Sequence, residues 1–207
     1  EGEHRDDEVV SHYPDVISLA ESRPLVVSAL VEYLLTHEQD WNIGQFRFML
    51  GNSVLSDMQQ KLSKAFDHYT VSSSNSYAIQ LPDNAEEYVQ SLSKSMRKQF
   101  RSRLTRMQNA GDIEIRSAND FDDPHEALEI LERLHRDRWQ DRDSSSIFDS
   151  GPFKTFHQTL FNRLLDKGII DIRVMYHDGE PIAAVHNFNF KQRCYSYQSG
   201  FSSQDDK

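Results

Sequence analysis

The chain has 207 residues, a formal net charge of −10 and a single cysteine, Cys194. This length is enough for one large domain or two small ones, and the acidic balance argues against a mainly nucleic-acid-binding protein. One cysteine allows no internal disulfide, which favours a reducing compartment. No apolar run approaches the ~20 residues of a membrane span, and no signal-peptide pattern opens the chain. We therefore expect a soluble, cytoplasmic protein, and a fragment of a longer chain because the first residue is not Met.

The first part of the chain predicts a polar segment, residues 1–21, followed by a small set of helices and strands. Ser22 and Pro24 form a helix-start signal, because Pro is favoured in the first turn of a helix. Later elements follow from alternation, apolar spacing and capping residues. The expected elements are a helix over residues 22–36, a strand over 41–49, a helix that Asn52 or Ser53 caps, and a strand over 77–81.

A long basic helix is expected over residues 84–110. Asp83, with Glu86 three residues later, resembles a capping box, and Gly111 follows the expected end. Six basic residues and no acidic residue lie between Lys94 and Arg106. At about 100° per residue, four of them share one face of the helix. These four are Lys94, Arg97, Lys98 and Arg101.

The remaining chain predicts a strand over residues 112–116, two helices and three consecutive strands within residues 170–201. Asp123-Pro124 starts the first helix, and Gly151-Pro152 opens the second. Residues 170–176 alternate apolar and polar side chains, as a half-buried strand does. Asp178-Gly179 and Lys191-Gln192 supply the turns between the last three strands. The pattern therefore predicts a three-strand antiparallel meander.

From residue 112 onward, the order strand, helix, helix, strand, strand, strand resembles the opening of the GNAT acyltransferase fold. The hairpin Asp178-Gly179-Glu180-Pro181-Ile182-Ala183 resembles the turn between its second and third strands. Residues 91–101 (SLSKSMRKQFR), 134–139 (LHRDRW) and 195–201 (YSYQSGF) resemble a bacterial branch described as cellulose-biosynthesis-type acetyltransferases. The resemblance spans about residues 41–201. It implies an α+β, GNAT-like mixed sheet flanked by helices.

Proteins of that branch usually carry two GNAT-like halves in tandem, as the Fem peptidyl transferases do. The resemblance then divides the chain into the closing part of a first half over residues 22–83, a connecting basic helix over 84–110, and the opening part of a second half over 111–207. The glycine-rich CoA loop with its helix, and the tyrosine that commonly protonates the leaving thiolate, would lie beyond Lys207. We therefore expect the fragment to be inactive by itself.

The resemblance implies direct transfer of an acyl group, in the first place acetyl, from acyl-CoA to an amine or hydroxyl, with a saccharide as a candidate acceptor. His186 is a candidate base because its intrinsic pKa is near neutral, and a hydrogen-bonded histidine without a catalytic part is the alternative. Residues 195–200 would lie along the thioester. Strand alternation would place Tyr195, Tyr197 and Ser199 on one face and Ser196, Gln198 and Gly200 on the other. Tyr197 is the second catalytic candidate, and Tyr195, Gln198, Ser199 and Gly200 are candidates for cofactor binding. Both tyrosines are equally consistent with sheet core.

Five further residues are candidates for acceptor binding: Arg97, Arg101, His135, Arg138 and Trp139. Alternatively, Trp139 belongs to the core and Arg138 pairs with Asp137, Asp141 or Asp143. The basic helix has three interpretations: a solvated face, a site for CoA phosphates or an acidic saccharide, or a tRNA contact. A tRNA contact would indicate a Fem-like aminoacyl-tRNA-dependent peptidyl transferase, and a non-catalytic GNAT-fold binding module is a further possibility. No HxxxH or HExxH spacing occurs among the nine histidines, so no metal is predicted.

Overall fold

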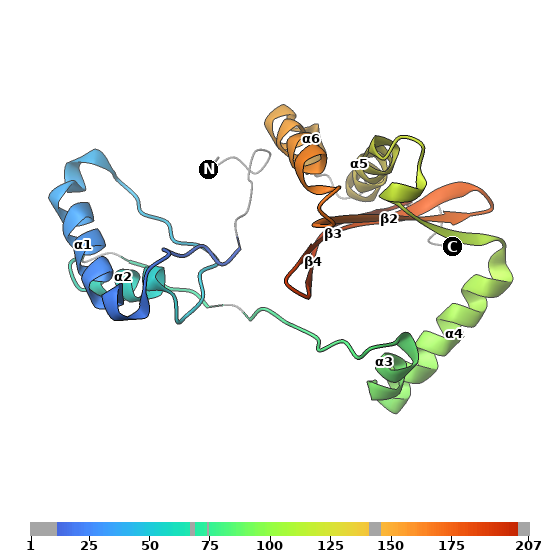
Figure 1. The fold of residues 1–207 in the computed structure, drawn as a ribbon, viewed down its shortest axis with the longest axis horizontal. Helices are drawn as coiled ribbons and strands as arrows, with labels where there is room; N and C mark the ends of the chain where they lie inside the picture. Colours follow the sequence, from blue (N-terminus) through green and yellow to red (C-terminus); the bar gives the residue numbers. More distant parts are fainter. Residues whose placement is uncertain (1–11, 67–68, 74, 141–145, 203–207) are drawn as a thin grey trace. The chain divides into compact units, whose positions relative to one another are not determined.

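A computed structural model describes residues 12–66, 69–73, 75–140 and 146–202 (Figure 1). The chain divides into two compact units, one over Val10–Ala78 and one that contains Ile79–Lys207. Each unit has its own apolar cluster. Whether the units are parts of two tandem halves stays a prediction.

The N-terminal unit is built on two helices, α1 (Arg23–Thr36) and α2 (Val54–Leu62), and both were predicted. Short 3-10 turns, Ala20–Ser22 and Glu38–Asp40, flank α1. The cap of α2 is Ser53, whose hydroxyl accepts the Ser56 N–H. Arg23 joins the helices, because its Nε donates to Asp57 at 2.8 Å and its guanidinium donates to the Ser53 carbonyl at 2.8 Å. The buried side chains of this unit are Val27, Val54, Met58 and Leu62.

The strands predicted over residues 41–49 and 77–81 are wrong, since the described residues there are irregular. A strand needs a paired neighbour, and neither segment pairs with a strand among the described residues. Phe48 has a φ of 54°, which is incompatible with a continuous strand. Within residues 41–49, Phe46 packs against the apolar cluster of α1 and α2, and the indole of Trp41 donates to the Leu34 carbonyl at 3.2 Å.

The single helix predicted over residues 84–110 is two helices, α3 (Ala85–Ser91) and α4 (Lys94–Ala110). Leu92 and Ser93 between them have extended ψ values of 154° and 155°. The Ser93 hydroxyl accepts the Met96 N–H and so begins a new helix, as capping serines do. Asn84, not Asp83, caps α3 by accepting the Glu87 N–H.

Four strands form one antiparallel sheet in the order β1-β2-β3-β4: β1 (Ile113–Ser117), β2 (Ile170–His177), β3 (Glu180–Phe190) and β4 (Arg193–Phe201). The predicted meander is therefore confirmed. Both of its turns use two consecutive residues with positive φ, Asp178-Gly179 and Lys191-Gln192, as tight hairpins require.

Helices α5 (His125–Gln140) and α6 (Gly151–Leu164) both cover one face of this sheet (Figure 1). Short 3-10 turns, Ala118–Asp120 and Ile147–Asp149, precede them. The side chains of β2 alternate between buried and more exposed, and its buried set packs against leucines of α5 and phenylalanines of α6. This arrangement confirms the predicted α+β class with helices flanking a sheet. The core members from these elements are Leu128, Leu131, Leu134, Phe153, Phe161, Ile170, Ile172 and Val174.

Candidate functional site

The candidate site begins at an irregularity in β4, which is the edge strand of the described sheet. Gln198 pairs with His186 and Ser196 pairs with Asn187, so Tyr197 has no partner on β3. Such a β-bulge inserts one extra residue and redirects neighbouring side chains. Strict alternation along β4 is therefore wrong: Tyr197 and Gly200, expected on opposite faces, both lie against the helices, Tyr197 at His157 of α6 and Gly200 at the α5 backbone.

Tyr197 forms a hydrogen-bonded pair with His157 of α6. The His157 Nδ1 lies 2.9 Å from the Phe153 carbonyl, and its Nε2 lies 2.9 Å from the Tyr197 hydroxyl. Because a carbonyl can only accept, Nδ1 carries the proton and Nε2 accepts from Tyr197. The two rings stack with centroids 5.4 Å apart and planes at 16°. Burial lowers the pKa of His157 and raises the pKa of Tyr197 to about 12, so the pair is neutral near pH 7.

His186 of β3 lies beside this pair and is 2% exposed. Its ring lies 5.4 Å from the Tyr197 ring and 6.3 Å from the His157 ring, centroid to centroid. Neither ring nitrogen of His186 has a hydrogen-bond partner. Burial, and then the charge that His157 would carry, lower the pKa of His186 to about 4. His186 is therefore neutral near pH 7, and the repulsion disfavours protonation of both histidines at once.

His135 and Trp139 of α5 form a second polar group, which reaches β4 through Gln198. The indole of Trp139 donates to His135 Nε2 at 3.1 Å, so the proton of His135 is on Nδ1, 2.9 Å from the Ser146 hydroxyl. Burial lowers the pKa of His135 to about 4, although the amide of Gln198 opposes this. The same amide acts against the effect of burial that raises the pKa of Tyr197.

Arg138, in the last turn of α5, reaches the end of β4. Its guanidinium donates to the Ser199 hydroxyl at 2.9 Å and to the Ser199 carbonyl at 3.3 Å. The guanidinium carbon lies 5.0 Å from the centre of the Phe201 ring. Its Nε is buried without a partner. Among the described residues, Arg138 therefore hydrogen-bonds to Ser199 rather than pairing with Asp137. The other two predicted partners, Asp141 and Asp143, lie outside the described residues.

The other two β4 candidates differ from each other in their surroundings. Gly200 is buried, and a Cβ built on it would overlap the backbone of Leu134 and His135. Close packing of β4 against α5 by itself requires glycine there. Tyr195 is 38% exposed and pairs with Phe188. Contact of either residue with a cofactor stays a prediction.

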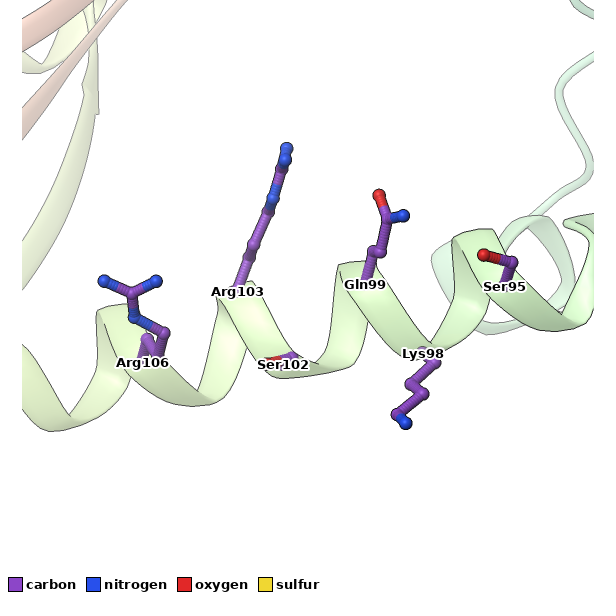
Figure 2. Close-up of a pocket in the computed structure, with 6 residues that line it drawn as sticks. All are labelled: Ser95, Lys98, Gln99, Ser102, Arg103 and Arg106. Atoms are coloured by element: carbon purple, nitrogen blue, oxygen red, sulfur yellow. The ribbon is translucent and has the colours of Figure 1, made fainter.

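The two arginines predicted on the basic helix do not join this cluster through any described contact. Arg97 donates to the Gln90 carbonyl at 2.7 Å, and Arg101 lies 3.6 Å from Glu86, so both contact α3. Figure 2 shows another side of α4, where Gln99, Arg103 and Arg106 project in one direction and Lys98 in another. The structure thus brings together His135, Arg138, Trp139, His186 and the β4 residues, but not Arg97 and Arg101.

His157 was missed by the sequence reasoning. It lies four residues from both Phe153 and Phe161, on the stripe that faces the core. A single polar residue in such a stripe was the available signal, because a buried polar group needs a partner. In the described part of the chain, no group of three His, Cys, Asp or Glu side chains could hold a metal ion. Among the same residues, no helix has the length and hydropathy to cross a membrane.

The described chain thus has a strand and two helices followed by an antiparallel meander, whose bulged edge strand carries polar side chains. The chain belongs to the GNAT acetyltransferase family, since residues 94–207, just over half of it, match the family model described as "Acetyltransferase (GNAT) domain". The resemblance predicted from the sequence is thereby confirmed at the level of the superfamily. GNAT domains act in acyl transfer and generally use acyl-CoA as the donor. No curated protein sequence matches the chain.

Proposed function

We propose that this protein transfers an acetyl or other acyl group from acyl-CoA to an amine or hydroxyl acceptor, with a saccharide as the first acceptor to test. The observation that carries the proposal is the GNAT match over the sheet whose edge strand has the Tyr197 bulge. The cellulose-biosynthesis-type branch, the tandem arrangement and a cytoplasmic location belong to the same proposal.

The residues of β4 fit a thioester donor in two respects. Because β4 is the edge of the described sheet, the outer backbone groups of Tyr195–Gly200 have no strand partner there. In addition, the Arg138 guanidinium lies at Ser199 and supplies a positive charge beside β4, which favours an anionic group of the donor or acceptor. Bound acyl-CoA supplies the activated carbonyl, and much of the acceleration comes from holding it in line with the acceptor.

Acyl transfer also requires a proton to leave the attacking amine or hydroxyl. Two imidazoles that are neutral near pH 7, His186 and His157, lie around Tyr197 and can accept a proton. The Tyr197 hydroxyl already donates to His157 Nε2, so a proton can pass from the acceptor to the tyrosine oxygen as the tyrosine proton moves to His157. In this proposal His135 and Trp139, which hydrogen-bond to each other on α5, lie on the acceptor side.

The experiment uses the protein together with any sequence that flanks it in its natural chain, because the chain by itself is expected to be inactive. It is incubated with acetyl-CoA and a panel of amino sugars, neutral sugars and small amines, and free CoA and the acetylated product are measured by chromatography with mass detection. Chromatography is needed because Cys194 is an exposed free thiol that would react with thiol reagents. The proposal expects an acetylated product whose formation falls at least tenfold in Tyr197→Phe. Product formation by none of the acceptors, with no detectable acetyl-CoA binding, would overturn it.

A further inference from the structure

Helix α4 exposes an apolar stripe that no described residue of its own unit, Ile79–Lys207, covers. None of its 17 residues is buried. The side chains of Met96, Phe100 and Leu104 are 52%, 42% and 38% exposed, and Met107 completes the stripe. At about 100° per residue, these four side chains fall within an arc of about 80°. Apolar side chains at this spacing normally face a core or a partner, so the stripe indicates a missing partner.

Basic side chains border this stripe on both sides. Arg97 and Arg101 follow Leu104 around the helix by about 20° and 60°, and Arg103 lies about 20° beyond Met96 on the other side. The six basic residues of α4 occur with no acidic residue between Lys94 and Ala110. The face opposite the stripe carries Lys94 and Lys98 together with small polar side chains, including Ser102, Thr105 and Asn109.

The charge of α4 also contrasts with that of the rest of the chain. With +6 on α4 and −10 in total, the remaining residues carry −16 by the same formal count. An anionic surface would therefore attract α4 and repel most of the other residues. This asymmetry favours one orientation, with α4 nearest to the surface.

We infer that α4 docks on an anionic lipid bilayer, lying in the plane of the headgroups with its apolar stripe inserted. An apolar stripe bordered by arginines is the pattern of an interfacial amphipathic helix, because the long aliphatic stems bury while the guanidinium groups reach lipid phosphates. RNA fits less well, since phosphate contacts use the basic residues and leave the apolar stripe in water. A helix that only contacts water would account neither for the apolar stripe nor for the arginines on both sides of it.

The test measures co-sedimentation of the full chain with vesicles of phosphatidylcholine alone and of equal parts phosphatidylcholine and phosphatidylglycerol, at low and high salt. The stripe variant Phe100→Ala with Leu104→Ala keeps every charge, and alanine supports the helix. The border variant carries Arg97→Gln, Arg101→Gln and Arg103→Gln. The control, Thr105→Ala with Asn109→Ala, shortens two exposed side chains on the opposite face. Circular dichroism checks that the helix content of each variant matches the parent.

The inference expects binding to the anionic vesicles that is at least tenfold stronger than to phosphatidylcholine and weaker at high salt. The stripe and border variants should each lose at least tenfold, and the control should bind like the parent. Absence of vesicle binding, or binding that the stripe variant retains in full, would overturn the inference. So would salt-sensitive binding of tRNA with no binding to vesicles. Because no acyl transfer is measured, these outcomes are separate from the test of the proposed function.

Discussion

Replacing His186 with leucine should make the protein less sensitive to acid without a large loss of stability at neutral pH. His186 is 2% exposed, and both of its ring nitrogens lack partners. An unpaired buried polar group costs about 1–3 kcal/mol, and leucine has a similar volume without polar atoms. We therefore expect the free energy of unfolding of His186→Leu at pH 7 to equal that of the parent or exceed it by about 1 kcal/mol.

The expected effect of pH follows from the lowered pKa of His186, about 4 in the folded chain against about 6.5 in an unfolded one. As the pH falls below about 6.5, the unfolded chain takes up this proton first, so the free energy of unfolding decreases until about pH 4. One pKa unit corresponds to ~1.4 kcal/mol, so His186 alone should remove about 2 kcal/mol between pH 7 and pH 5. The leucine variant should lack this contribution.

Urea unfolding followed by circular dichroism at pH 7 and pH 5 measures both effects. His135, whose pKa burial also lowers, stays in the parent and the variant, so its contribution is common to both. Phe188→Leu is the matched control, since it changes a ring neighbour of His186 but keeps the titrating group. The reasoning is refuted if His186→Leu loses more than about 2 kcal/mol at pH 7, as an ordinary core substitution would, or if it keeps the pH dependence of the parent.

Three further substitutions test the site and the packing around it. Tyr197→Phe removes the hydroxyl that donates to His157, so it should lower the free energy of unfolding by about 1 kcal/mol, as urea unfolding measures. It should also lower acetyl transfer at least tenfold in the chromatographic assay. Gly200→Ala should lower the free energy of unfolding by about 2–4 kcal/mol, because the new methyl group would overlap the α5 backbone. Gly151→Ala is the control and should be nearly neutral, since no atom lies near its new methyl group. Equal melting temperatures of the two variants would contradict this prediction. Asp15→Ala removes a carboxylate that accepts the Val54 and Leu55 N–H groups at the start of α2. It should lower the free energy of unfolding of the N-terminal unit by about 1–2 kcal/mol, as urea unfolding measures. An unchanged urea midpoint would contradict this capping role.

Elements whose partners are close in the sequence were predictable. The meander follows from alternation and from turn residues such as Asp178-Gly179, and helices α1, α2, α5 and α6 follow from apolar spacing with start signals. The strands expected at residues 41–49 and 77–81 failed because alternation alone does not provide a neighbouring strand. The break between α3 and α4 was missed because a serine such as Ser93 is compatible both with the exposed surface of a continuous helix and with the cap of a new one.

The site was predictable in its strands but not in its contacts. His186 and the β4 residues were identified from the order of elements, and the structure places them together with His135 and Arg138. The bulge at Tyr197 has no marker in the sequence, because one unpaired residue depends on how β3 and β4 align. The partnership of His157 with Tyr197 depends on packing between residues 40 positions apart, which periodicity cannot specify.

The central claim is that the thioester donor binds along β4, beside the Tyr197–His157 pair. The most direct measurement is a titration of the isotope-labelled protein with acetyl-CoA, followed by amide chemical shifts in nuclear magnetic resonance spectra. The account predicts saturable changes in the chemical shifts of the Tyr195–Gly200 amides and of the nuclei of the His157 ring. Saturation with acetyl-CoA that leaves the β4 amides unmoved while shifting residues elsewhere would contradict it.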